Sequence, residues 1–285
     1  MDMLRLVLPP VLIPAGLAFV IALLGRGAWR APLAIGLAYA AGHRFVRGEW
    51  PPLPFGETTL TAQHWRFYLA LVAAVAGVGL ARVRRAPVRW VIVAGVAAVA
   101  ARATLDARFR HRWELGEGVL WLGVSAAALL VQWWLSGINP RSEKSSTSPW
   151  WDACLLGTGL ALSLQFSRQS SNAQLAGALT AAVGALAVAG HLGRGASWEP
   201  GAAAAWLWIF GALVVEGHVF GKLPLASALV LAAHPLAFRI SWRLEKGTRG
   251  LWGFALARVP AAIVAGAAVV LARRLVEASS YSYGP

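Results

Sequence analysis

Long apolar runs, separated by short polar connections, fill almost the whole chain. About ten of them approach the roughly 20 residues that a helix needs to cross the hydrocarbon core of a bilayer. The runs lack strand-like alternation, and backbone in lipid must satisfy its own hydrogen bonds, so each is expected to be an α-helix. The expected spans are 4–24, 29–46, 66–83, 88–105, 117–138, 150–167, 173–191, 201–220, 223–239 and 251–272.

Two features of the connections suggest how the spans are organised. The segment 139–149 (NPRSEKSSTSP) is the most polar stretch and predicts a hinge between a first half, 1–138, and a second half, 150–285. Halves of about five spans would be inverted relative to each other, which is a common transporter plan. Pro260 is a point where the last span can divide into a surface helix and a shorter span.

Composition places the protein in a membrane. Hydrophobic residues make up 58% of the chain and charged residues only 13%, whereas a soluble domain carries about a quarter charged residues. Most of the outer surface must therefore face lipid, and the fold class is an all-α polytopic transmembrane bundle. Most of the fifteen Trp residues stand at the ends of apolar runs, among them Trp50, Trp134 and Trp150, as in an aromatic belt.

The net charge of +14 does not indicate a nucleic-acid partner, because the basic residues are spread over many short loops. Basic loops beside membrane spans reflect topology and anionic lipid. They divide almost evenly between the two sides, so they do not set the orientation. Arg far outnumbers Lys, as in GC-rich bacterial genomes, which favours a bacterial inner membrane. The run 4–24 is too long for a signal peptide and is expected to remain as the first span.

Recognisable catalytic and metal-binding motifs do not occur in the sequence. Cys154 is the single cysteine, so no disulfide within the chain and no thiol-based metal site is expected. No two of the six His residues have the helical spacing of a metal site. Phosphate-binding loops, zinc-protease motifs and nucleophile elbows are also missing. We therefore expect no catalytic residue, cofactor or metal, and the balance is against an enzyme.

Four ionisable residues in the last three spans are the candidate site: Glu216, His218, His234 and Arg258. Charge inside a bilayer is costly, so such residues are functional candidates. Brought together, they would bind an anionic or protonatable substrate or relay protons. In the alternative interpretation they act separately. His234 then bonds a carbonyl that Pro235 leaves free, while the others lie near water.

Small residues repeat every fourth position in one span: Ala173, Gly177, Ala181, Ala185 and Ala189. Such a stripe lets membrane helices approach closely. It predicts either a tightly packed helix within the bundle or the seam of a dimer.

Several segments resemble a family of bacterial polytopic membrane proteins from planctomycetes, myxobacteria and related groups, a family without an assigned activity. They are GHRFVRGEWPPLP (42–54), SRQSSNAQLAGALTAAVG (167–184), GHVFGKLPLASALVL (217–231) and YSYG (281–284). The resemblance implies an inner-membrane protein and transfers no catalytic residue. The length and the span count also resemble the drug/metabolite transporter plan, by architecture alone.

Three functions remain open from the sequence. The first is a structural or accessory subunit of the inner membrane, with a membrane-protein partner or a second copy. The second is a small-molecule carrier that uses the four-residue group. The third is a membrane enzyme acting on a lipid-linked substrate between the loops 48–65 and 102–117. An even number of expected spans separates these loops, which places them on the same side.

Overall fold

The computed structural model describes residues 2–24, 27–53, 60–111, 113–135, 148–193, 198–247 and 250–281. These ranges contain helices and no strand, which confirms the all-α prediction. The eleven helices are α1 (Asp2–Leu23), α2 (Arg30–Arg47), α3 (Ala62–Arg82), α4 (Ala86–His111), α5 (Leu115–Leu135), α6 (Ser148–Phe166), α7 (Ser170–His191), α8 (Pro200–Val219), α9 (Leu225–Ala232), α10 (His234–Gly247) and α11 (Gly250–Tyr281).

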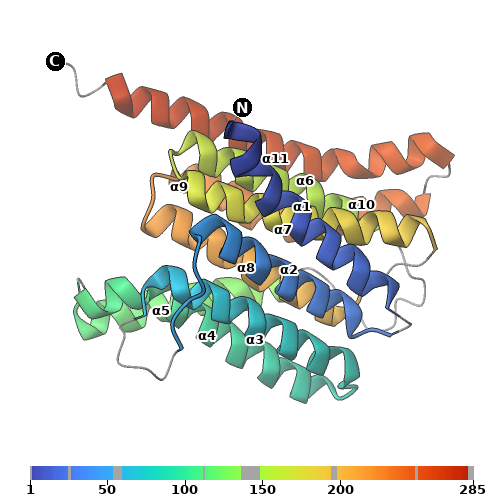
Figure 1. Ribbon diagram of the computed structural model, residues 1–285, viewed down its shortest axis with the longest axis horizontal. Coiled ribbons are helices and arrows are strands. Elements are labelled where there is room, and N and C mark those ends of the chain that lie inside the picture. Colours follow the sequence, from blue (N-terminus) through green and yellow to red (C-terminus); the bar gives the residue numbers. More distant parts are fainter. Residues whose placement is uncertain are drawn as a thin grey trace.

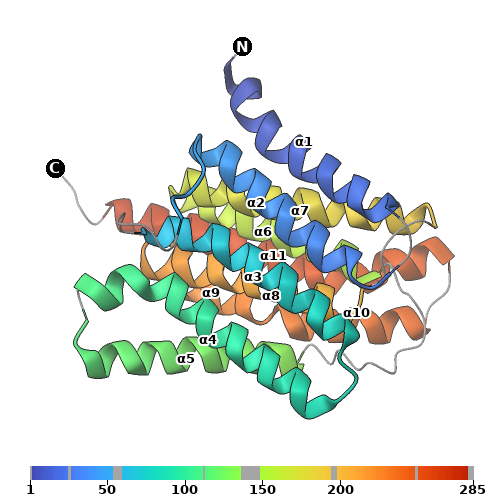
Figure 2. The ribbon, with the colours of Figure 1, turned by 60° about the horizontal axis from the view of Figure 1, so that its bottom comes forward.

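The helices form one bundle of rods that run back and forth between two ends (Figures 1 and 2). Seven are long and apolar enough to cross a membrane: α3, α4, α5, α7, α8, α9 together with α10, and α11. α1, α2 and α6 run alongside these seven, so every expected span coincides with a helix. The protein is an integral, multi-span membrane protein. The predicted hinge lies largely outside the described residues, and its last two residues, Ser148 and Pro149, already belong to α6.

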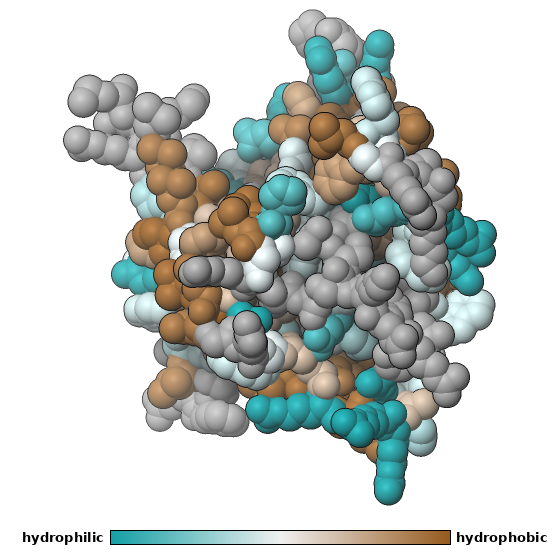
Figure 3. Space-filling view, turned by 90° about the vertical axis from the view of Figure 1, so that its right-hand side faces the viewer, coloured by the Kyte–Doolittle hydropathy of each residue, from teal (hydrophilic) through white to brown (hydrophobic). Residues whose placement is uncertain are grey.

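α8 lies in the middle of the bundle. It packs against α2, α3, α4, α5 and α9 and is buried along almost its whole length. The outer helices α5 and α11 instead expose large apolar side chains such as Leu120 and Ile263. Those surfaces suit lipid. At the end of the bundle that lies to the right in Figure 1, Figure 3 shows apolar side chains along one margin and polar ones along others.

The ninth span is broken where Pro235 interrupts the helix. Proline has no N–H to donate to the carbonyl of Leu231, four residues earlier. The His234 ring replaces that bond, with Nδ1 lying 3.0 Å from the Leu231 carbonyl oxygen. Because a carbonyl only accepts, Nδ1 carries the proton. Pro260 behaves differently, since α11 continues through it without a break, and the expected division of the last span is absent.

The small-residue stripe only partly explains the packing of α7. This helix is enclosed by α1, α2 and α6, as a tightly packed helix should be. However, Gly177, Ala181 and Ala185 of the stripe are only half-buried. The close approach is made by Ala178, whose Cβ would lie 2.5 Å from a Cβ added at Gly42.

The aromatic-belt prediction also needs correction, because Trp150 is fully buried against Trp198 while Trp50 and Trp134 are exposed.

α3 and α8 cross closely where Gly77 faces Gly201. A Cβ added at Gly77 would lie 2.5 Å from the Pro32 Cβ and 2.7 Å from the Gly201 carbonyl oxygen. A Cβ added at Gly79, two residues along the same helix, would have no heavy atom within 4 Å. The crossing therefore requires glycine at position 77 and not at position 79.

We expect Gly77→Ala to lower the free energy of unfolding by about 1–3 kcal/mol, because rigid backbone must move to admit the methyl group. Gly79→Ala is the matched control and should leave stability unchanged or slightly raised, since alanine favours helix. Thermal unfolding in detergent, followed by circular dichroism, measures both. Equal stability of the two variants would show that α3 and α8 do not approach this closely.

Candidate functional site

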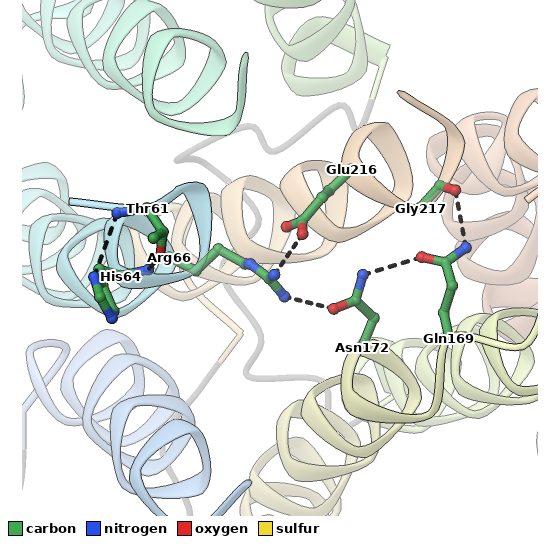
Figure 4. A network of polar contacts seen from close by, with 7 residues as sticks. All are labelled: Thr61, His64, Arg66, Gln169, Asn172, Glu216 and Gly217. Atoms are coloured by element: carbon green, nitrogen blue, oxygen red, sulfur yellow. Dashed lines mark hydrogen bonds and ion pairs between the residues drawn. The ribbon is translucent and has the colours of Figure 1, made fainter. Parts of the chain in front are cut away.

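A chain of polar side chains joins α3, α7 and α8 at one end of the bundle (Figure 4). The guanidinium of Arg66 forms an ion pair with Glu216. Arg66 Nη1 also donates to Asn172 Oδ1 at 2.8 Å. Asn172 Nδ2 donates to Gln169 Oε1 at 3.0 Å, and Gln169 Nε2 donates to the Gly217 carbonyl at 2.9 Å. Residues more than a hundred positions apart thus form one hydrogen-bonded network.

The ends of the helices bring these residues to the same depth. Arg66 and Asn172 lie in the first turns of α3 and α7, and Glu216 lies in the last turn of α8. These helix ends meet at the left of Figure 1. A capping box fixes the start of α3, since the His64 amide donates to Thr61 Oγ1 and the Thr61 amide to His64 Nδ1. The site therefore lies about one turn inside the bundle.

The ion pair is withdrawn from solvent. Its side chains are only 2% exposed for Arg66 and 6% exposed for Glu216. Arg66 Nε and Glu216 Oε2 are buried without a hydrogen-bond partner among the described residues. Arg47 and Tyr39 interact electrostatically with both members of the pair. A buried pair seldom adds stability over apolar side chains of the same size, so its presence in a membrane points to a function.

A pocket of about 270 Å³ opens beside the network. It is lined by Arg47, Arg168, Gln169, Ser170, Ser171, Asn172, Glu216, Phe220 and Gly221. Among these lining residues Glu216 is the one acid, and Arg66 already pairs with it. The Arg47 and Arg168 guanidinium groups therefore give the pocket an excess of positive charge. A pocket of this size and charge suits a small ligand with an anionic group.

Arg168 occupies an unusual backbone position at the pocket. It has a φ of 59°, in the left-handed region. The Arg168 amide bonds the Gln165 carbonyl, and the Gln169 amide bonds the Leu164 carbonyl, which is the Schellman pattern at the end of α6. Glycine is the usual residue at such a position. Here an arginine is held beside the pocket despite the strain.

The four candidate residues from the sequence do not converge on one place. Glu216 belongs to the network, and the His218 ring Nδ1 lies 3.0 Å from the Leu223 carbonyl in the turn after α8. His234 lies among Trp206, Phe210 and Phe238. Trp206 precedes Glu216 by ten residues, or about 15 Å along α8. Among the contacts of the described residues, none joins two of the four candidates.

Arg258 forms a separate polar cluster near the other end of the bundle. Its guanidinium lies 3.7 Å from Asp152 Oδ1 and 3.8 Å from Glu245 Oε1. It also lies 4.4 Å from the centre of the Phe254 ring. Arg258 and Asp152 are both buried. The distances are longer than hydrogen bonds, so this cluster is more loosely joined than the Arg66–Glu216 network.

Sequence reasoning missed Arg66 as the ion-pair partner of Glu216, and it missed Asn172 and Arg47 beside that pair. A usable signal existed. The expected topology places the start of the third span and the end of the eighth at the same side, and Arg66 and Glu216 lie about equally far from those ends. Arg66 begins the expected span 66–83 and Asn172 directly precedes the expected span 173–191, and polar residues at the ends of spans are ordinary in membrane proteins.

The described parts of the segments 48–65 and 102–117, proposed for an enzyme, lie at one end, because α3 and α4 return the chain to the side where α2 ends (Figure 2). However, α4 extends to His111 and α5 begins at Leu115, so most of the segment 102–117 is helix and not the expected loop. Arg108, near the end of α4, donates to the Val219 carbonyl at 2.9 Å and so ties that end to α8. Within the described ranges, no three His, Cys, Asp or Glu residues are grouped to hold a metal. The arrangement offers charge and hydrogen bonds for binding a ligand.

Comparison of the chain with protein-family models, with curated proteins and with solved structures finds no match. The resemblance of its motifs to a bacterial family is therefore not established as membership. The hydropathy, the helix lengths and the buried polar network are the features that describe this molecule. They identify it as an integral membrane protein of many helical spans with a polar pocket at one end.

Proposed function

We propose that the protein is a small-molecule carrier and that its solute binds in the pocket between α2, α7 and α8. The single observation that carries this proposal is the buried Arg66–Glu216 network, which leaves Glu216 Oε2 unsatisfied beside a positively charged pocket. Ionisable groups held inside a membrane bundle commonly mark solute pathways. The expected arrangement in two inverted halves of five spans supports the same proposal.

Uptake into proteoliposomes tests the carrier. Purified protein is reconstituted and offered a panel of labelled small anionic and zwitterionic solutes. For the solute that is taken up, we expect Arg47→Gln to reduce uptake about tenfold or more, because a hydrogen bond to a charged group contributes about 1.5–3 kcal/mol. Arg273→Gln, at an exposed position of α11, is the matched control. A protein that takes up and binds none of the panel would contradict the proposal.

Arg168→Gly separates binding from folding. Glycine relieves about 1–2 kcal/mol of left-handed strain, which offsets the roughly 0.5–1 kcal/mol that its flexibility costs. The variant should therefore be at least as stable as the wild type in a thermal unfolding experiment. It should nevertheless bind the solute several-fold more weakly, since a guanidinium has left the pocket. Unchanged affinity would remove Arg168 from the site.

A structural or accessory subunit is the second candidate function. The observation that favours it is the aromatic packing around His234, where Trp206, Phe210 and Phe238 fill the middle of the bundle. A rigid centre suits a protein that supports a partner. Co-purification of a membrane-protein partner, or of a second copy, together with absent uptake would favour this function over the carrier.

The proposed membrane is the inner membrane of a bacterium. The arginine-rich, lysine-poor composition supports this proposal, as do the segments that resemble the bacterial family. Fractionation of cells that express the tagged protein should place it with inner-membrane markers, and recovery with the outer membrane would contradict the assignment.

A further inference from the structure

The start of α7 opens into the pocket without a side-chain cap. The first amide groups of a helix have no partner within the helix and carry partial positive charge. Gln169 at the cap position makes no capping hydrogen bond, because its amide is engaged with Asn172 and Gly217. Ser170, Ser171 and Asn172, which begin the helix, all line the pocket. This end of the pocket suits an anion.

Arg47 and Arg168 strengthen the preference of the pocket for an anionic group. Both line the pocket, and Arg47 Nε is buried without a hydrogen-bond partner in the described part of the chain. Three guanidinium groups, including that of Arg66, thus stand against the single carboxylate of Glu216. An anionic group of a ligand, whether carboxylate or phosphate, would receive charge-assisted hydrogen bonds here.

Glu216 imposes a different requirement on the ligand. Its side chain is about 94% buried, it lines the pocket, and Oε2 has no partner among the described residues. A carboxylate oxygen only accepts hydrogen bonds. An anion alone would leave Oε2 unsatisfied and would add a second negative charge near it. A ligand that also carries an ammonium group would satisfy Oε2 and reduce the repulsion.

We propose that the pocket recognises a small zwitterion, with its anionic group at the start of α7 between Arg47 and Arg168 and its primary ammonium on Glu216 Oε2. This proposal rests on the proposed binding function and names the chemical class of the ligand. Two sources share this chemistry: a free amino-acid-like solute, and the ethanolamine phosphate headgroup of a lipid, which the open pocket at the bundle end can admit.

Three probes of equal carbon number test the assignment on the wild-type protein in detergent. β-Alanine carries both charges, propionate only the negative one, and propylamine only the positive one. We expect β-alanine to bind about tenfold or more tightly than either of the others, measured by calorimetry and by the shift in Tm. O-phosphoethanolamine should bind like β-alanine. Nanodiscs of phosphatidylethanolamine or phosphatidylglycerol test the lipid source.

Glu216→Gln tests the ammonium end. The glutamine keeps the size of the side chain but loses its charge, so β-alanine should bind at least tenfold more weakly while propionate binds equally well or better. Glu277→Gln, on the exposed face of α11, is the matched control. If Glu216→Gln does not fold, the comparison of the three probes still tests the zwitterion assignment, because it uses the wild-type protein.

The outcomes distinguish failure of the zwitterion assignment from failure of the proposed carrier function. Propionate binding as tightly as β-alanine would overturn the zwitterion assignment and leave the carrier proposal standing. Stabilisation by phosphatidylethanolamine nanodiscs alone would uphold the zwitterion chemistry and contradict a carrier of free solutes. Failure of every probe to bind, with no uptake of any solute, would overturn both.

Discussion

Replacing Arg66 with methionine is expected to lower the free energy of unfolding by about 3–5 kcal/mol, because it leaves the carboxylate of Glu216 buried without its partner. The two side chains are 2% and 6% exposed, so water does not replace the lost guanidinium. Asn172 Oδ1 would also lose its donor. Unfolding in detergent, by heat or by a denaturant series followed by circular dichroism, measures the difference.

A double variant tests whether the unpaired, buried carboxylate of Glu216 causes the loss of stability. Arg66→Met with Glu216→Leu replaces both charges by apolar side chains of similar volume, and we expect it to recover at least the wild-type stability. Arg273→Met breaks the exposed pair with Glu277 and should leave the unfolding midpoint unchanged. A single Arg66→Met variant as stable as that control would mean that water reaches Glu216. The double variant should fold and yet fail to bind solute, which separates stability from function.

The sequence predicted the fold well because the bilayer imposes a strong constraint. A run of about 20 apolar residues in lipid must be helical, whatever its neighbours. Each of the ten expected runs is accordingly a helix, with ends that shift by a few residues. The largest shifts are at the ends of the last two spans. The ninth, expected to end at residue 239, continues past the turn at Ala233 to Gly247, and the tenth, expected to end at residue 272, continues to Tyr281.

Pro235 and Pro260 show that the local sequence does not predict whether a proline breaks its helix. Pro235 breaks its helix and Pro260 does not, although both interrupt apolar runs. At Pro235 the freed Leu231 carbonyl accepts a hydrogen bond from the His234 ring, which is fixed between aromatic side chains. This hydrogen bond was one of the two alternatives predicted for His234. The course of the chain at Pro260 depends on packing against α6 and α10, which no local pattern reports.

The candidate site was only partly predictable. Glu216 stood out as an acid in an apolar run, but Arg66, Asn172 and Arg47 around it come from three other helices, α3, α7 and α2. Sequence periodicity tells which face a residue occupies and not which helix lies opposite. The pairing of Arg66 with Glu216 required the order of the helices in space. For the same reason, periodicity did not predict that His218, His234 and Arg258 lie outside the Arg66–Glu216 network. Among the described residues, no contact joins them to Glu216 to support the proposed joint function.

Trp206→Ala is expected to lower the free energy of unfolding by about 3–5 kcal/mol, as for other large aromatic side chains removed from a packed interior. Trp206 is 1% exposed. Its ring stacks on Phe210 at 4.5 Å between centroids and meets the His234 ring edge-on at 5.0 Å. The alanine variant leaves a cavity where α8 and α10 meet. Thermal unfolding in detergent measures the loss.

Trp252→Ala provides the matched control, since the same side chain at that position is 83% exposed on α11 and its loss opens no cavity. Trp206→Phe should cost less than Trp206→Ala, because it keeps an aromatic ring and removes an N–H that has no partner in the described residues. Equal, small effects of both alanine variants would contradict a packed centre.

The pocket lies about 15 Å away from Trp206 along α8, and changes that far apart are usually independent. Solute affinity should therefore be unchanged in Trp206→Ala.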